Sequence, residues 1–222
     1  MIDLGAEHAC PVVALVTAMD RPLGNACGNA LEVAEAIEVL KGAGPTDLIE
    51  VTFALGAEML LLATLASTRE GARAMMDAAI RSGKALRKFE EIISAQGGDT
   101  GVVNDPRRLP QARHRVVFKA DREGVVQSVD PRAVGYGVIA LGGGRRNMEE
   151  KVDPSVGFVL TAKPEDQVSK GQALATVYAR TKKDLEAGCA VLEQAIVIGE
   201  SAPRPLPLVS HRITAGGVES LV

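Results

Sequence analysis

The sequence predicts an α/β protein in two parts: part of a mixed α/β lobe, made of a strand and helices over residues 1–112, and a C-terminal α+β domain over residues 113–222. Three observations support this prediction. An aliphatic and β-branched run near the N-terminus leads through a glycine-rich turn into a helical segment, three more helical segments follow, and beyond the Pro-containing stretch 105–110 short β-rich runs alternate with turns. At 222 residues the chain can form two modest domains, since single domains usually contain roughly 100 to 200 residues.

The segment Val12–Thr17 is a continuous run of β-branched and aliphatic residues. It predicts a strand buried on both faces, as in the interior of a parallel sheet. Asn29, followed three residues later by Glu32, resembles a capping box and predicts a helix over 30–40 that ends at Gly42. An interior strand without its neighbours would leave unpaired backbone groups, so we expect the chain to associate with itself or with another polypeptide.

Three consecutive helices are predicted between residues 47 and 98. The first covers 48–65 and is apolar almost all round, so we expect it to be buried. The second and third end at glycines, Gly83 and the pair Gly97-Gly98. The start signals of the three helices are Asp47 with Glu50, Ser67 with Glu70, and Ser82.

The C-terminal domain begins near Arg113. Its two strand-rich stretches, 116–129 and 157–178, are related in a way that resembles the sandwiched barrel of biotinyl and lipoyl carriers, so we predict a barrel-sandwich-like β core with 165–171 as a turn. The segment 184–198 predicts a helix ahead of a Pro-rich extended end. A swinging carrier is disfavoured, because no Met-Lys-Met or comparable lysine lies at a hairpin tip and Lys119 lies at a strand entry.

Composition excludes several kinds of partner. With 25 Lys+Arg against 28 Asp+Glu, the net charge is −3, so no basic field is available to bind nucleic acid or an anionic membrane. The longest apolar run, near 59–63, is far shorter than the roughly 20 residues of a membrane span. The N-terminus lacks the features of a secretory signal, so a cytoplasmic location is expected.

Several residues that could carry chemistry lack a suitable spacing. The three cysteines, Cys10, Cys27 and Cys189, form neither a disulfide framework nor a zinc motif. No histidine has a partner in a spacing typical of a triad or metal cluster, and the pairs Glu90-Glu91 and Glu149-Glu150 are sequence neighbours, which point apart on a helix. The sequence therefore offers no candidate catalytic or cofactor-binding residue, and these side chains are expected to be structural or solvated; the histidines are His8, His114 and His211.

The glycine-rich loop 141–146 (LGGGRR) is also expected to be structural. It lacks both the GK[ST] ending of a P-loop and the GxGxxG spacing, so a glycine-rich connection with two solvated arginines is favoured over a phosphate-binding loop.

The most informative segment is 17–36, TAMDRPLGNACGNALEVAEA. It contains a strand end, a glycine-rich turn and a helix start, where backbone carbonyl oxygens can remain free to face a ligand. Glu35, near the start of the helix, could complete a set of hard oxygen ligands around a cation. From the residues alone, a tight turn with a solvated Glu35 is the alternative.

This segment, with its PLGxAxGNALEVxEA pattern, resembles the pyrimidine-nucleoside (thymidine) phosphorylase family. The resemblance continues in family order through essentially the whole chain, and its N-terminal MIxLG resembles the end of an internal family helix, which implies that the chain begins part way through a domain. It further implies that 113–222 is the family's C-terminal β-rich domain. The matching stretches are GAGPxDL at 42–48, AQGG at 95–98, ADRxG at 120–124, LGGGR at 141–145 and VDPSVG at 152–157.

The resemblance implies a potassium ion as cofactor. In the family, two carbonyl groups of the PLGxA turn and the second glutamate of the following helix hold this ion, and they correspond to Leu23, Ala26 and Glu35. Because further ligands come from an upstream phosphate-binding loop, the site here is partial. The resemblance also implies that the 141–146 loop faces the cleft between lobes and helps in domain closure, with Arg145 as the contact.

The implied reaction is phosphorolysis of thymidine, deoxyuridine or uridine by phosphate in a homodimeric enzyme. The family's phosphate-binding and base-binding stretches, including Ser-Gly-Arg and Thr-Gly-Gly-Thr-x-Asp, have no counterpart in these 222 residues. We therefore expect the chain alone to be inactive. The alternative is a non-catalytic structural or interaction module that needs a separate chain carrying the N-terminal half.

Overall fold

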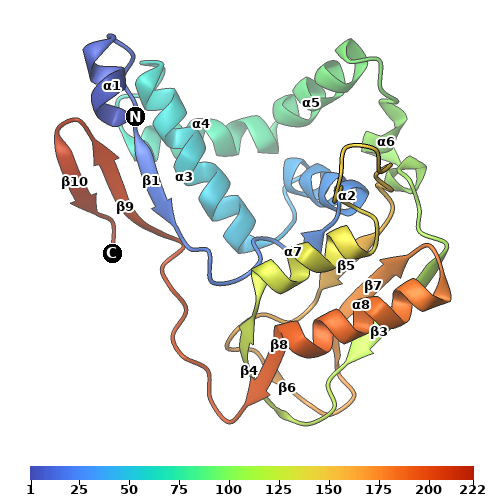
Figure 1. Ribbon diagram of the computed structural model, residues 1–222. Coiled ribbons are helices and arrows are strands. Elements are labelled where there is room, and N and C mark those ends of the chain that lie inside the picture. Colours follow the sequence, from blue (N-terminus) through green and yellow to red (C-terminus); the bar gives the residue numbers. More distant parts are fainter.

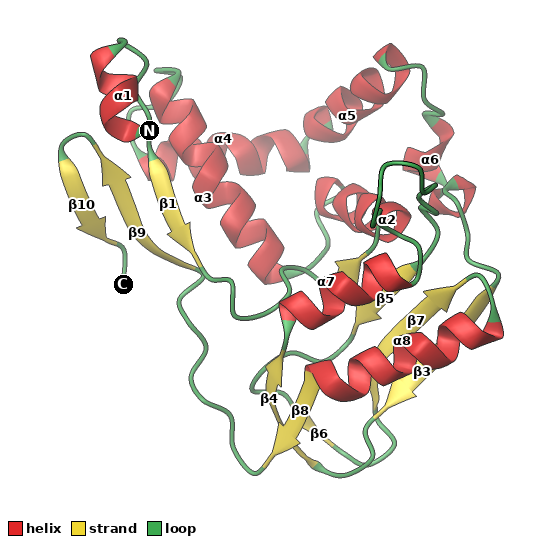
Figure 2. Cartoon of the chain, in the orientation of Figure 1, coloured by secondary structure: helices red, strands yellow, loops and turns green.

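The computed structural model describes all residues from Met1 to Val222 (Figure 1). Its first half is mainly helical and its second half mainly β (Figure 2). The elements of residues 1–112 are α1 (Ile2–Glu7), β1 (Ala14–Thr17), β2 (Ala26–Cys27), α2 (Asn29–Leu40), α3 (Thr46–Leu62), α4 (Arg69–Arg81), α5 (Lys84–Ala95), α6 (Gly101–Asn104) and a 3-10 turn at Pro106–Arg108. Those of residues 113–222 are β3 (His114–Lys119), β4 (Gly124–Val129), α7 (Pro131–Ala140), β5 (Gly157–Leu160), β6 (Gln167–Val168), β7 (Ala173–Ala179), α8 (Lys182–Ala195), β8 (Ile196–Gly199), β9 (Val209–Thr214) and β10 (Gly217–Ser220).

The C-terminal half contains the main core. One sheet has the strand order β2-β5-β7-β3 and a second has the order β6-β4-β8, with all pairings antiparallel. Helices α7 and α8 pack against each other and against β5 and β7 (Figure 1). Eighteen buried residues, with Phe158, Leu174 and Leu192 among the largest, form one cluster here, against three in the cluster around Ile37. Most of the hydrophobic stabilisation therefore comes from this half. The mixed α/β architecture with a β-rich C-terminal core is confirmed.

The prediction of a fully buried parallel strand at 12–17 was wrong. Strand β1 covers only Ala14–Thr17, pairs antiparallel with β9, and lies at the edge of the sheet β1-β9-β10. Its burial is partial, and Val16 is 44% exposed. A run of β-branched residues indicates a strand but does not indicate its direction or its partner, and here the partner lies almost 200 residues further along the chain.

Helix α3 is less buried than its apolar composition predicts. It packs on α4, where Gly56 lets the Met76 side chain approach closely, but Leu55, Met59 and Leu62 are 47%, 71% and 42% exposed. These three residues follow the spacing i, i+4, i+7 and so form one stripe on the helix, which we call the α3 stripe. The apolar pattern predicted the helix correctly but not how much of it this chain covers.

Helix starts differ from the predicted ones in detail. Gly28, not Asn29, is the N-cap of α2, and only the returning half of the capping box forms, because Glu32 Oε1 accepts the Gly28 N–H at 2.9 Å. The N-cap of α4 is Thr68, whose hydroxyl accepts the Gly71 N–H, rather than Ser67. The three helices predicted between 47 and 98 are confirmed as α3, α4 and α5.

The predicted helix 184–198 ends early. Helix α8 stops at Ala195, and residues 196–199 form β8, which pairs with β4. None of the helices is both long and apolar enough to cross a lipid bilayer.

Two segments pair across the predicted domain boundary. Strand β2, from the first half of the chain, joins the β-domain sheet beside β5, and β9 returns from the C-terminal end to pair with β1. The boundary at 112/113 stays a prediction. The segment between β1 and α2 is therefore anchored at both ends by strands of the second half of the chain, by β9 through β1 and by β5 through β2.

Candidate functional site

The turn before α2, residues 22–28, is fixed by the Glu35 side chain. Glu35 lies in the second turn of α2, and its Oε1 accepts the N–H groups of Asn25 and Ala26 at 2.9 and 3.1 Å. Its other oxygen, Oε2, lies against Gly24, whose φ of +70° is in the region that favours glycine. Glu35 is therefore part of the turn and not a solvated side chain.

Strand β5 and Glu35 hold Asn25 and Ala26 between them. Asn25 accepts the Leu160 N–H at 2.8 Å, and Ala26 lies opposite Val159 of β5. The Ala26 N–H is not part of this pairing, because it donates to Glu35 Oε1 at 3.1 Å.

The three predicted ligand residues border one cavity. Leu23, Ala26 and Glu35 line a hollow of about 590 Å³, together with Glu32 and residues of α7. The donor set is two neutral backbone carbonyls and a carboxylate, all hard oxygen ligands. These three ligands together carry one negative charge, from Glu35, which would suit a monovalent cation. The Glu32 carboxylate also borders the hollow, where its Oε1 accepts the Gly28 N–H.

Asp47, at the start of α3, also binds this turn. Its Oδ2 accepts the Gly24 N–H at 3.3 Å, and its Oδ1 accepts the Leu48 N–H at 2.9 Å. Lys163, in the loop after β5, forms an ion pair with Oδ2. Burial acts to raise the pKa of Asp47, but the hydrogen bond and charge of Lys163 and the two N–H groups outweigh it, so that the pKa lies below its usual value.

Cys27 lies within the turn but is not set up as a nucleophile. It is half-buried, and burial together with the charges of Glu32 and Glu35 raises the pKa of its thiol to about 12. The thiolate, which is the reactive form, is therefore strongly disfavoured at neutral pH. Cys10 and Cys189 are also free thiols.

The glycine-rich loop 141–146 contacts the start of α2. The Asn29 side chain donates a hydrogen bond to the Gly143 carbonyl at 2.9 Å. Arg145 is exposed. Its role in closing a cleft stays a prediction.

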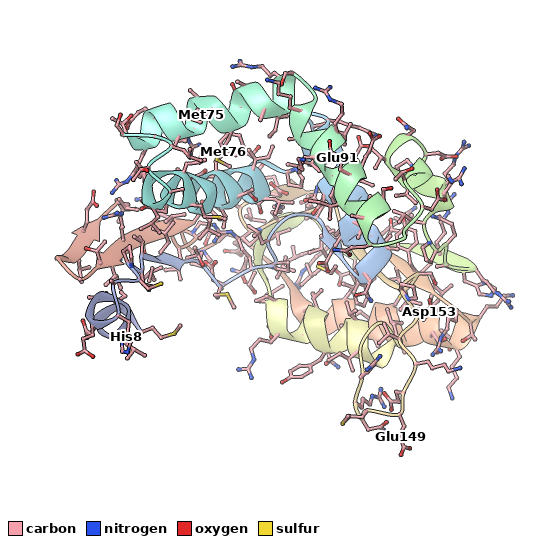
Figure 3. All side chains as sticks on the ribbon, turned by 90° about the horizontal axis from the view of Figure 1, so that it is seen from above. His8, Met75, Met76, Glu91, Glu149 and Asp153 are labelled. Atoms are coloured by element: carbon pink, nitrogen blue, oxygen red, sulfur yellow. The ribbon has the colours of Figure 1, made fainter.

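The remaining sequence candidates lie apart. Figure 3 shows His8 at the end of α1, Glu91 on α5 and Glu149 at the tip of the loop after α7, each on a different outer part of the molecule. Nδ1 of His211 lies 3.0 Å from Oγ of Ser210, but that hydroxyl donates to the Val16 carbonyl within the sheet. No cluster of three or more His, Cys, Asp or Glu side chains suits a metal ion. Lys119 ends β3, and because β3 and β4 belong to different sheets, it does not lie at a hairpin tip.

The sequence pattern does not reveal the contribution of Asp47 and Lys163. It marks Asp47 only as a helix start, and it gives no signal at Lys163. The two residues are separated by 116 positions, and no local pattern relates them.

Comparisons with known proteins agree with the motif resemblance. Residues 8–86 match the model of the "Glycosyl transferase family, a/b domain", and residues 125–199 match that of the "Pyrimidine nucleoside phosphorylase C-terminal domain". A pyrimidine-nucleoside phosphorylase of Staphylococcus epidermidis is 41% identical over 183 residues, which are 82% of this chain and 42% of the relative. One of Staphylococcus aureus is 40% identical over 205 residues, which are 92% of this chain and 47% of the relative. The chain thus spans about half the length of the curated relatives it matches.

Proposed function

Because the chain belongs to the pyrimidine-nucleoside phosphorylase family, we propose that it is the C-terminal portion of a pentosyltransferase that splits thymidine or uridine with phosphate. The products are the free base and (deoxy)ribose 1-phosphate. The observation that carries the proposal is the 22–28 turn, in which Glu35 binds two backbone N–H groups beside a cavity that Leu23 and Ala26 also line.

The chain's own residues build one wall of a cation site. Leu23 and Ala26 would hold a potassium ion through their carbonyl oxygens and Glu35 through its carboxylate, while the N–H groups of Asn25 and Ala26 keep that carboxylate in place. When bound, the ion supplies a fixed positive charge that favours anionic groups nearby. Asn29 ties this wall to the glycine-rich loop 141–146.

Phosphorolysis depends on groups that position phosphate and stabilise the departing base. The family's residues for both tasks have no counterpart in this sequence. We propose that the chain alone has no activity, and that the complete enzyme is a cytoplasmic homodimer.

A hybrid enzyme tests the proposal. In the Staphylococcus aureus relative, the 205-residue matched portion is replaced by the corresponding part of this chain, and the hybrid is incubated with thymidine and phosphate. We expect phosphate-dependent release of thymine from the hybrid and none from this chain alone. A folded hybrid without thymine release would contradict the proposed function, and turnover by the chain alone would contradict the proposed inactivity.

A second candidate is a non-catalytic interaction module that binds a separate chain. Three observations favour a missing partner: β1 has a free edge, the α3 stripe is exposed, and Oε2 of the buried Glu58 has no hydrogen-bond donor. An open edge strand and an exposed apolar surface are features that polypeptide partners cover.

Co-expression with the unmatched part of the Staphylococcus aureus relative separates the two candidates. A stoichiometric complex that releases thymine supports the C-terminal portion of a phosphorylase, and a complex without turnover supports the module. Met59→Glu, in the α3 stripe, should weaken the complex, whereas Met75→Glu, 45% exposed on α4, serves as the control. A monodisperse monomer that ignores the added part would contradict the module, whereas the hybrid enzyme tests the phosphorylase portion.

A further inference from the structure

The peptide unit between Leu23 and Gly24 links Asp47 to the cation wall. A trans peptide holds its C=O and N–H in opposite directions, and no peptide bond in the chain is cis. The Gly24 N–H donates to Asp47 Oδ2 at 3.3 Å. The Leu23 carbonyl oxygen, which belongs to the same unit, therefore points away from Asp47.

Two hollows border the turn, and they have different linings. Asp47 and Lys163 line a polar hollow of about 540 Å³. Leu23, Ala26 and Glu35 line a second hollow of about 590 Å³, which Asp47 does not line. The Leu23 carbonyl group, which points away from Asp47, therefore belongs to a residue of the Glu35 hollow.

Lys163 holds Asp47 in this position. Its ammonium group binds the same Oδ2 that accepts the Gly24 N–H, and the Lys163 N–H donates to Asp166 at 2.8 Å, which anchors the loop after β5. The Asp47 side chain is 13% exposed, so its charge would be costly to leave without a partner. Lys163 lines the polar hollow and not the Glu35 cavity, so it acts on the turn through the Asp47 carboxylate.

We propose that Asp47 is a positioning residue for the cation site: it orients the Leu23 carbonyl oxygen through the Gly24 N–H, and Lys163 fixes it there. The proposal rests on the potassium site of the proposed function. Asp47 acts at a distance, because a ligand in the Glu35 cavity would contact Leu23 and not Asp47.

The test measures thermal unfolding of the 222-residue chain in potassium chloride and in choline chloride at equal ionic strength. A ligand that binds only the folded state raises the unfolding temperature, so the difference between the two salts reports potassium binding. Asp47→Ala removes the acceptor of the Gly24 N–H, and Asp47→Asn keeps an oxygen acceptor but removes the charge. We expect Asp47→Ala to weaken potassium binding about tenfold, the usual scale of a lost hydrogen bond to a charged group, and Asp47→Asn to weaken it less.

Asp130→Ala is the matched control. Asp130 caps α7 by accepting the Arg132 and Ala133 N–H groups, so its loss should lower the unfolding temperature equally in both salts and leave the potassium effect unchanged. If Asp47→Ala does not fold, Asp47→Leu replaces it, since leucine has the shape of asparagine and no acceptor.

Equal losses in the Asn and Ala variants would mean that charge and not orientation acts, and would overturn the proposal. So would an unchanged potassium effect in Asp47→Ala. If the unsubstituted chain itself responds equally to both salts, the cation site fails and the positioning role fails with it.

Discussion

The Glu35 carboxylate lies against Gly24, in the space that a β-carbon at position 24 would occupy. The same carboxylate binds the N–H groups of the next two residues, Asn25 and Ala26. A side chain from the helix thus determines both the backbone conformation and the residue type of the turn that precedes it. The region that carries the proposed function is therefore sensitive to single substitutions at position 24.

Gly24→Ala should destabilise the chain by about 2–4 kcal/mol, because alanine is strained at a φ of +70° and its β-carbon would displace Glu35. Gly97→Ala is the control, since Gly97 has a φ of +75° but no heavy atom close to the added carbon. It should cost only the strain, about 1 kcal/mol. Urea unfolding measures both, and equal losses would contradict the contact between Glu35 and Gly24.

Glu58→Ala should loosen the C-terminal hairpin from α3. Glu58 is 6% exposed and binds Arg212 of β9 at 2.9 Å and Arg69 of α4 at 3.3 Å. Its removal leaves two arginines without this partner, and we expect a loss of about 2 kcal/mol.

Asp77→Ala, which breaks the exposed pair with Arg81, is the control and should cost at most about 0.5 kcal/mol. Urea unfolding and amide hydrogen exchange in β9 measure the effect of Glu58→Ala. Unchanged exchange in Val209–Thr214 would argue that the ion pairs do not hold the hairpin.

Thiol labelling at pH 8 should separate Cys27 from Cys10. Cys10 is exposed, whereas burial and two nearby glutamates raise the pKa of Cys27 to about 12, so that Cys27 remains a neutral thiol. Peptide mass spectrometry after a short iodoacetamide pulse should find Cys10 modified and Cys27 modified only after denaturation. Labelling of both at the same rate in the folded chain would show that the turn is open.

Acid should destabilise the turn through Asp47. Its folded-state pKa is lowered, so Asp47 contributes stability that is fully present above its unfolded pKa, about 3.9, and is lost as the pH falls through the folded value. Asp47→Asn should be less stable than the unsubstituted chain at neutral pH, and the difference should shrink below pH about 4. Unfolding midpoints measured across this range check the sign, and a difference that grows on acidification would contradict it.

Much of the fold follows from local patterns. Glycines at helix ends and capping residues ahead of apolar runs predicted α2 to α5. Short β-rich stretches separated by turns predicted the β-rich second half. Each of these signals depends on residues close in sequence. The pairing of β1 with β9 could not be predicted in this way. The aliphatic run Val12–Thr17 fits a buried parallel strand as well as an antiparallel edge strand, and only the tertiary structure decides.

The candidate site divides in the same way. Leu23, Ala26 and Glu35 fall within 13 residues of one motif, so the sequence could group them, and the structure adds that the N–H groups of the turn hold Glu35. Asp47 and Lys163 come from other elements and meet the turn only through folding. The exposure of α3 could not be predicted for a different reason. An apolar composition indicates that a helix can be buried, but it does not show whether another part of the chain covers it.

Binding of thallium(I), a close analogue of potassium with a sensitive magnetic nucleus, tests the central claim most directly. The thallium resonance should shift and broaden when the unsubstituted chain is added in a chloride-free nitrate buffer, potassium nitrate should reverse this, and choline nitrate should not. Glu35→Gln, which keeps an oxygen acceptor for Asn25 and Ala26 but removes the charge, should abolish the effect while the chain stays folded. A Glu35→Gln variant that binds thallium as tightly as the unsubstituted chain would contradict the assignment of this turn as a cation site.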